Sequence, residues 1–234
     1  MKLMKNIFIL TFLFLFFGNI NINAQRNHEI SPYQEFLNEL SEYRKLCRNA
    51  LKPYRYDGSK TTHFSYKDYN YSKEVEIGTI QNSEYRLSFN SNGIRYDKIK
   101  VEIYDKSKNY KSRMLLYEKD GVGQNEFTVE TGPMLEQLKE KKSQLCNEKY
   151  DELLRTAETD AKYQRISTED HIYNLNNKKK IEKKIISKMR LKRLYINYII
   201  PAIDREIIVD EVTGEEVRVV TKGAIVLAIG YSNL

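Results

Sequence analysis

The densest charge in this sequence is a run of lysines and arginines between residues 178 and 193. Its members are Lys178, Lys179, Lys180, Lys183, Lys184, Lys188, Arg190, Lys192 and Arg193, and Glu182 is the one acidic residue among them. Clustered cations attract phosphates and other polyanions, and counterion release makes such binding strongly dependent on salt. The alternative is a solvated helix face with Ile181, Ile185, Ile186 and Met189 turned inward, which is the commoner role of a charged run.

Aromatic residues crowd the segment 54–71 and offer a second surface for contact. They are Tyr54, Tyr56, His63, Phe64, Tyr66, Tyr69 and Tyr71. Tyrosine combines an apolar ring with a polar hydroxyl, which suits it to stacking on sugars and to protein interfaces. The plainer alternative is a turn at Asp57 and Gly58 followed by a strand over 61–67, with Phe64 and Tyr66 in the core.

The two cysteines, Cys47 and Cys146, allow one intramolecular disulfide in an oxidising compartment. That bond would close a loop of about a hundred residues and stabilise the fold by roughly 4 to 5 kcal/mol in the chain-entropy treatment. Two buried thiols that behave as small apolar residues are the alternative. Spacing alone does not decide between them, because a disulfide needs two Cα atoms within about 7 Å.

Motifs for catalysis or metal binding are absent from the sequence. The three histidines, His28, His63 and His171, lie in unrelated contexts, and neither cysteine has a neighbour at metal-ligand spacing. Carboxylates that can pair for glycoside hydrolysis occur on or beside predicted strands, namely Glu102, Asp105, Glu118, Asp204 and Asp210. Each of them also fits an outward-facing acid. We therefore predict no metal, no cofactor and no enzymatic activity, with a hydrolase as the remaining alternative.

Residues 1–24 have the pattern of a cleaved signal peptide. Lys2 and Lys5 precede an apolar run over 7–17 that is too short to span a bilayer, and we expect cleavage after Ala24. The Phe- and Asn-rich leader, which closes in Asn23, Ala24 and Gln25, resembles leaders of exported proteins of the Bacteroidota type. This resemblance implies export to the periplasm, the outer membrane or the medium. Loss of the two leader lysines lowers the formal net charge from +7 to +5.

The elements that must position these residues begin with a helix. Ser31 as N-cap, Pro32 at the first position and Gln34 form a capping box, and Pro53 ends the helix. An apolar stripe at helical spacing runs along it, made of Tyr33, Phe36, Leu37, Leu40, Tyr43, Cys47 and Leu51. We expect this stripe to pack on the protein's own sheet rather than on a partner chain.

Alternation of apolar and polar residues predicts β-strands through much of the remaining chain. The strand-like segments are 61–67, 73–80, 84–90, 98–105, 112–118, 125–131, 191–200, 206–212, 216–221 and 224–231. Residues 96–131 are expected to form an antiparallel meander of three strands, because the links are too short for a crossover helix. The apolar run 114–117 suits a strand covered on both faces, and the almost wholly apolar segment 224–231 is predicted to be central.

From Gly132 the pattern becomes helical and heavily charged. A helix is predicted from 132 to about 162, with an apolar stripe made of Leu135, Leu138, Leu145, Cys146, Leu153 and Leu154. Residues 163–177 are polar and predicted to be a loop, before the basic helix. The predicted fold class is α+β: an antiparallel β-sandwich of about nine strands with an N-terminal helix and a charged helical insertion at about 132–186. The mature chain, 25–234, is expected to be one domain.

These features favour a non-catalytic, exported or envelope-associated protein that binds another protein through the helical insertion or the segment 54–71. At the level of fold alone, the chain resembles small exported β-sandwich adaptors and binding modules. The alternative is recognition of an anionic or glycan polymer by the basic residues 178–193 and the tyrosines near Tyr66. Nucleic acid is not an expected partner, and no transmembrane anchor is expected after cleavage.

Overall fold

The computed structural model describes residues 31–80, 83–204, 207–209, 216–218 and 221–233, with the backbone alone for 207–209 and 216–218. The predicted cleavage point, His28, Asp210 and residues 213–215, which separate the predicted strands 206–212 and 216–221, lie outside these residues. The chain divides into two compact units, Met1–Glu35 and Phe36–Leu234, and both large sheets belong to the second. No helix in the described part is long and apolar enough to cross a membrane.

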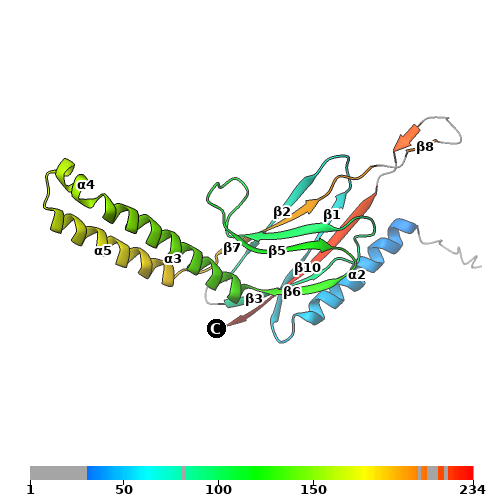
Figure 1. Cartoon of the computed structure of the whole chain (residues 1–234). Coiled ribbons are helices and arrows are strands. Elements are labelled where there is room, and N and C mark those ends of the chain that lie inside the picture. The colour runs from blue at the N-terminus through cyan, green and yellow to red at the C-terminus, as the bar shows by residue number, and fades with distance from the viewer. Residues whose placement is uncertain (1–30, 81–82, 205–206, 210–215, 219–220, 234) are drawn as a thin grey trace, which may run out of the picture. The chain divides into compact units, whose positions relative to one another are not determined.

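Two four-stranded sheets form the body of the second unit (Figure 1). The first sheet has the order β1 (Arg55–Ser65), β10 (Lys222–Asn233), β3 (Ser83–Asn90), β6 (Glu126–Glu130). The second has the order β2 (Tyr71–Gly78), β7 (Arg193–Ile200), β4 (Ile99–Tyr104), β5 (Leu115–Val122). All neighbouring strands are antiparallel, and β8 (Ile207–Val209) pairs with β9 (Glu216–Arg218), within the segments predicted as strands at 206–212 and 216–221. The predicted α+β sandwich is confirmed.

One hydrophobic core lies between the two sheets. Leu87 of β3 and Leu227 of β10 contribute to it from the first sheet, and Ile103 of β4 and Ile196 of β7 from the second. All four side chains are fully buried. Along β7 the alternate residues Leu194, Ile196, Tyr198 and Ile200 point into this core, as their period of two predicts.

Strand β10 carries apolar residues on both faces, and other parts of the protein cover both faces. Its inward residues join the core, whereas Ala224, Val226 and Ala228 meet the helix α2 (Pro32–Ala50) through Leu40 and Cys47. The small outward side chains let the helix approach the sheet closely. The central position of β10 and the packing of the helix on the sheet are therefore confirmed. The Ser31 Oγ accepts a hydrogen bond from the Gln34 backbone N–H at 3.2 Å, so the predicted N-cap forms.

The predicted three-strand meander is wrong. Strands β4 and β5 pair, but β6 crosses to the other sheet and pairs with β3. Strand β5 begins at Leu115, continues through Gly121 at φ +65° to Val122, and lies at a sheet edge. Leu116 is buried but Leu115 and Tyr117 are only half-buried, so the strand is not covered fully on both faces. Alternation shows which side chains share a face, but it does not show which sheet supplies the neighbouring strand. The turn predicted at Asp57 and Gly58 is also wrong, because this pair forms an irregularity inside β1.

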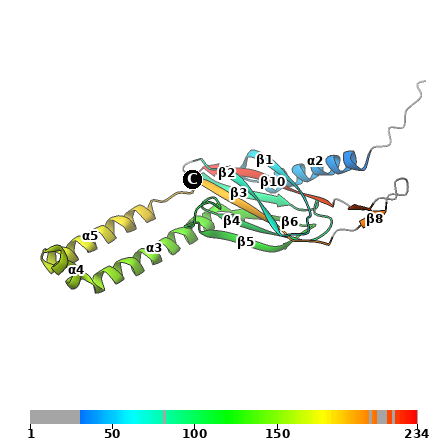
Figure 2. The same cartoon turned by 90° about the horizontal axis from the view of Figure 1, so that it is seen from above.

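Three helices lie between β6 and β7: α3 (Thr131–Arg155), α4 (Ala157–Gln164) and α5 (Thr168–Ser187). In both views α3 and α5 run side by side as a hairpin, with α4 at its far end (Figures 1 and 2). The loop predicted over 163–177 is wrong, because α5 already begins at Thr168. The Ser167 Oγ caps α5 by accepting a hydrogen bond from the Asp170 N–H at 3.4 Å. The carboxylates of Glu169 and Asp170 interact favourably with the partial positive charge at the N-terminus of this helix.

The two cysteines do not form a disulfide. Cys47 is buried between α2 and β10, where its thiol donates to the Val226 carbonyl oxygen at 3.7 Å. Cys146 is buried in the interior of the helical hairpin, in a different hydrophobic cluster. Both are free thiols, and burial raises the pKa of Cys47 to about 11. The alternative of two buried thiols is the one that the structure supports.

We expect neither thiol of the native protein to react with iodoacetamide at pH 8, because both side chains are buried and the Cys47 thiol stays protonated. In denaturant both should be labelled without prior reduction, and intact-mass spectrometry counts the added groups. Failure of the unreduced, unfolded chain to take up label would instead reveal a disulfide.

Candidate functional site

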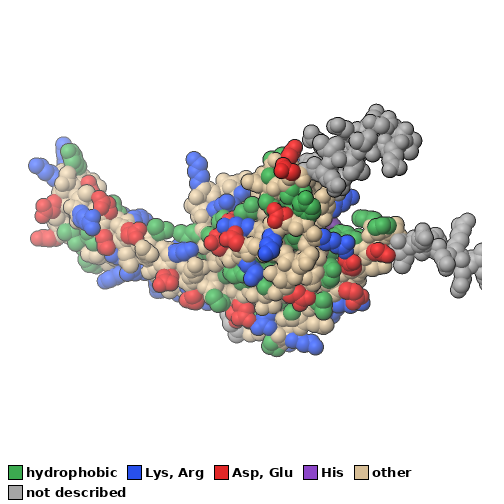
Figure 3. Space-filling model, turned by 45° about the vertical axis from the view of Figure 1, so that its right-hand side comes forward, with side chains coloured by type: hydrophobic (Ala, Val, Ile, Leu, Met, Phe, Trp, Pro, Cys, Tyr) green, Lys and Arg blue, Asp and Glu red, His purple; other side chains and the backbone are tan. Residues whose placement is uncertain are grey.

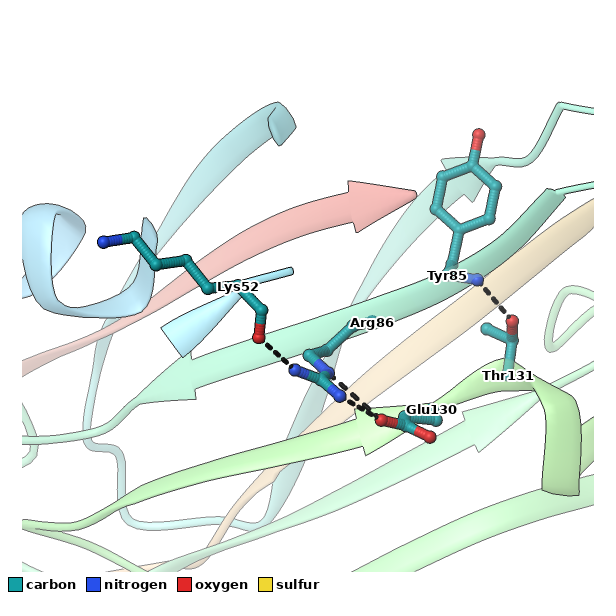
Figure 4. Close-up of polar contacts among 5 residues, drawn as sticks. All are labelled: Lys52, Tyr85, Arg86, Glu130 and Thr131. Carbon is teal, nitrogen blue, oxygen red and sulfur yellow. Dashed lines mark hydrogen bonds and ion pairs between the residues drawn. The ribbon is translucent and has the colours of Figure 1, made fainter. Parts of the chain in front are cut away.

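The base of the helical hairpin is tied to the first sheet by a small polar network (Figure 4). The Thr131 Oγ1, in the first turn of α3, accepts from the Tyr85 backbone N–H of β3 at 2.8 Å. The Arg86 guanidinium donates to the Glu130 carboxylate from Nε at 3.1 Å and to the Lys52 carbonyl oxygen at 2.6 Å. Met134 and Leu138 of α3 enter the main core. The hairpin is therefore anchored where it leaves the sandwich.

The remainder of the hairpin has an interior of its own. Cys146, Tyr150, Ala157, Leu175 and Ile186 pack together between the helices. Two ion pairs cross from α3 to α5: Lys149 Nζ lies 2.9 Å from Glu182, and Lys179 Nζ lies 2.8 Å from Asp151. These lysines, as hydrogen-bond donors and positive charges, hold the pKa values of Glu182 and Asp151 below their ordinary range. Both pairs join the sides of α3 and α5 that face each other.

Large apolar side chains remain on the outside of this hairpin. Ile181 and Ile185 of α5 are 61% and 62% exposed, and Leu145 of α3 is 52% exposed. The expectation that both isoleucines turn inward is wrong, whereas Ile186 is buried and Met189 is half-buried. Neighbouring residues on a helix lie about 100° apart, and here Ile186 packs in the hairpin interior while Ile185 is exposed to solvent. Figure 3 shows hydrophobic side chains among charged ones along the hairpin.

The structure divides the predicted basic cluster into two groups. Lys178, Lys180, Lys183 and Lys184 are exposed on α5, and among the described residues they make no ion pair. Lys179 belongs to the interior of the hairpin through its pair with Asp151. Arg190, Lys192 and Arg193 lie instead in and after the link that joins α5 to β7.

That second group lines a cleft of about 400 Å³ at the base of the hairpin. We call it the basic cleft, and its lining residues are Asp105, Lys106, Ser107, Tyr110, Leu138, Lys142, Met189, Arg190, Leu191, Lys192, Arg193 and Tyr195. Lys106 and Lys142 come from the β4–β5 loop and from α3, so five cations converge from three parts of the chain. Their spacing in the sequence contains no signal of this convergence.

The tyrosine-rich segment does not join the basic cleft. Phe64 and Tyr66 are buried, and the Tyr66 hydroxyl donates to the Asp97 carbonyl oxygen, so the core interpretation of this segment is confirmed. Tyr54 and Tyr71 are half-buried, and Tyr56 and Tyr69 are 42% and 54% exposed. In the β2–β7 register Tyr71 pairs with Ile200 and Gly78 with Arg193. Seven strand residues separate the two ends by about 23 Å, so the tyrosines and the basic cleft do not form one surface.

Three of the five candidate carboxylates are engaged in structural contacts. Glu102 is buried, accepts from the Tyr104 hydroxyl at 2.8 Å and lies 3.2 Å from Lys100 Nζ. Glu118 lies 3.1 Å from the same ammonium, whose pKa these two carboxylates raise above its ordinary value. Asp105 Oδ1 accepts from the Met114 N–H at 2.6 Å, and Asp204 is exposed. In the described part of the chain no His, Cys, Asp and Glu side chains form a group that could hold a metal ion.

In the part of the chain that the structure describes, the outer face of the helical hairpin and the basic cleft are thus candidate sites. Neither site has a counterpart to guide its interpretation, since no protein-family model, no curated protein and no solved structure matches this chain.

Proposed function

We propose that this protein is a non-catalytic binding protein that docks on a partner protein through the outer face of its helical hairpin. The observation that carries the proposal is the exposure of Ile181 and Ile185 among lysines on a helix whose inward face is already filled. Folding of the hairpin leaves these two side chains in water. A partner that covers them would remove their exposed apolar surface from water.

Helical spacing defines the docking face. Lys178, Ile181 and Ile185 follow one another at intervals of three and four residues, so they lie along one side of α5. Lys188, the C-cap of α5, follows three residues later. Lys180 and Lys184 form the adjacent row. Glu182, the acid within this stretch, points toward α3 and pairs with Lys149. The face therefore consists of two isoleucines flanked by cations.

This chemistry selects an acidic, partly apolar surface on the partner. Burial of each isoleucine contributes about 1.5 to 3 kcal/mol, and the lysines around them favour Asp and Glu on the opposing surface. A rim of charges mainly affects the rate of encounter and its salt dependence, whereas the apolar centre determines how long the complex lasts. The predicted leader would place the partner in the cell envelope or among secreted proteins.

Replacement of both Ile181 and Ile185 by Ser is expected to reduce partner binding at least tenfold, because it removes the apolar centre of the face and leaves the hairpin interior intact. Binding is measured by capture from envelope extract on immobilised protein, with quantitative mass spectrometry of the retained proteins. A matched control is the pair Tyr163→Ser and Ile166→Ser, which removes two exposed apolar side chains at the far end of the hairpin.

The control should retain the same partner as the native protein, and urea unfolding should show that both variants remain folded. Equal capture by the Ile181 and Ile185 variant would contradict the proposed face. Retention of an acidic polymer alone, lost between low and physiological salt, would favour the polymer alternative instead.

A further inference from the structure

We infer that the basic cleft is a separate binding site for an acidic sugar, meaning a sugar unit that carries a carboxylate, sulfate or phosphate group. The inference does not depend on the proposed docking face, because the two sites use different residues. It rests on the arrangement of cations, apolar side chains and tyrosines around one cavity.

Hydrogen bonds hold the walls of the cleft in position. On one side the β4–β5 loop reaches strand β2, where Ser107 Oγ and the Lys108 N–H donate to the Glu74 carboxylate at 3.0 and 2.8 Å. On the other side the Thr79 N–H donates to the Lys192 carbonyl oxygen at 3.0 Å and fixes the link between α5 and β7. The cleft is therefore formed before any ligand arrives, which lowers the entropic cost of binding.

Four of the five cations in the cleft have no acidic partner among the described residues. Arg193 pairs with Glu76 at 2.9 Å, but within the described residues Lys106, Lys142, Arg190 and Lys192 have no carboxylate within ion-pair distance. Lys106 donates to the uncharged Ser112, and Arg190 to the Met189 carbonyl oxygen. Asp105, the acid in the lining, is bound to the Met114 N–H. Like charges gathered in a concave site focus a positive potential, which attracts an anion.

The shape and lining define the rest of the ligand. Leu138 is buried, and Leu191 and Met189 are half-buried, so part of the cleft is apolar. Tyr110 and Tyr195 also line it. A volume of about 400 Å³ is within the range of small-ligand sites. Tyrosine rings and aliphatic side chains suit the C–H face of a sugar ring, and lysine and arginine suit its acidic group.

The test is isothermal titration of the full chain with glucuronate, glucose 6-phosphate, glucose and inorganic phosphate. We expect the two acidic sugars to bind, glucose to give no heat, and inorganic phosphate to bind at least tenfold more weakly than the sugar phosphate. Replacement of Lys142 and Arg190 by Gln should weaken acidic-sugar binding at least tenfold. The charge-matched control replaces Lys162 and Arg165, exposed cations at the far end of the hairpin, by Gln and should bind like the native protein.

Absence of heat with both acidic sugars, or equal binding by the Lys142 and Arg190 variant that is still folded by urea unfolding, would overturn the inference. Equal affinity for inorganic phosphate and glucose 6-phosphate would overturn the sugar part of it. A trigalacturonate arm separates two sources of the same chemistry. If trigalacturonate binds more tightly than glucuronate, the natural ligand is the acidic unit of a polymer. If the two bind equally, the natural ligand is a free sugar acid. Since the Ile181 and Ile185 variant should bind these sugars normally, failure of one proposal leaves the other standing.

Discussion

Replacement of Gly93 by Ala is expected to destabilise the protein by about 3 kcal/mol, because it forces a methyl group into a closed space. A Cβ atom at this position would lie 2.6 Å from the Ala224 carbonyl oxygen and 3.3 Å from Leu40 Cδ2. The Ala224 N–H donates to the Gly93 carbonyl oxygen at 3.0 Å, and β10 is hydrogen-bonded on both sides. The obstructing atom is therefore backbone that cannot move without breaking the central strand.

Gly78→Ala is the matched control, since a Cβ atom there meets nothing within 4 Å. Urea unfolding of the three proteins measures the difference, and the control should unfold within about 0.5 kcal/mol of the native protein. An unchanged midpoint for Gly93→Ala would show that β10 and α2 yield at this point. The Asn92 and Gly93 pair is typical of a turn, and the turn forms, because the Ile94 N–H donates to the Ser91 carbonyl oxygen at 2.9 Å. Gly93 does not have a positive φ in this turn. Close approach of β10, rather than turn geometry, is what requires glycine here.

Alkaline unfolding is the second large effect that we expect. Burial raises the pKa of Tyr66 to about 12, and it raises the pKa of the fully buried Tyr198 above the ordinary tyrosine range. Because the neutral phenol is the form that the folded state favours, the stabilisation is complete below about pH 10, the ordinary pKa. It is lost as pH rises from about 10 through the higher pKa of the folded state, at about 1.4 kcal/mol per pH unit for each such tyrosine.

The free energy of unfolding in urea, measured from pH 8 to 11.5, should fall steeply above pH 10. Tyr66→Phe and Tyr198→Phe should each reduce that slope, although each also loses a hydroxyl hydrogen bond worth about 1 kcal/mol at neutral pH. Tyr163→Phe, at an 83% exposed position, should leave the slope unchanged. A slope that neither buried variant alters would assign the alkaline transition to other groups.

Local patterns in the sequence determined most elements of the fold. The period of two in 194–200 placed Leu194, Ile196, Tyr198 and Ile200 in the core, and the uninterrupted apolar segment 224–231 identified the central strand. Ser31 and Pro32 located the start of α2. These signals are local, since a strand or helix carries its own periodicity and its own caps. The cap at Ser167 was also present in the sequence, within a segment whose polarity predicted a loop.

Which elements meet depends on packing between distant parts of the chain. Strand β6 pairs in the sheet of β3, and Cys47 and Cys146 lie in separate hydrophobic clusters. Ile181 and Ile185 are exposed to solvent. Lys106 and Lys142 line the same cleft as Arg190 and Lys192, although these residues lie far apart in the chain. The physical reason is that periodicity determines the face of an element, whereas its neighbours follow from packing between distant segments. The basic cluster could therefore be read from the sequence, but the cleft could not.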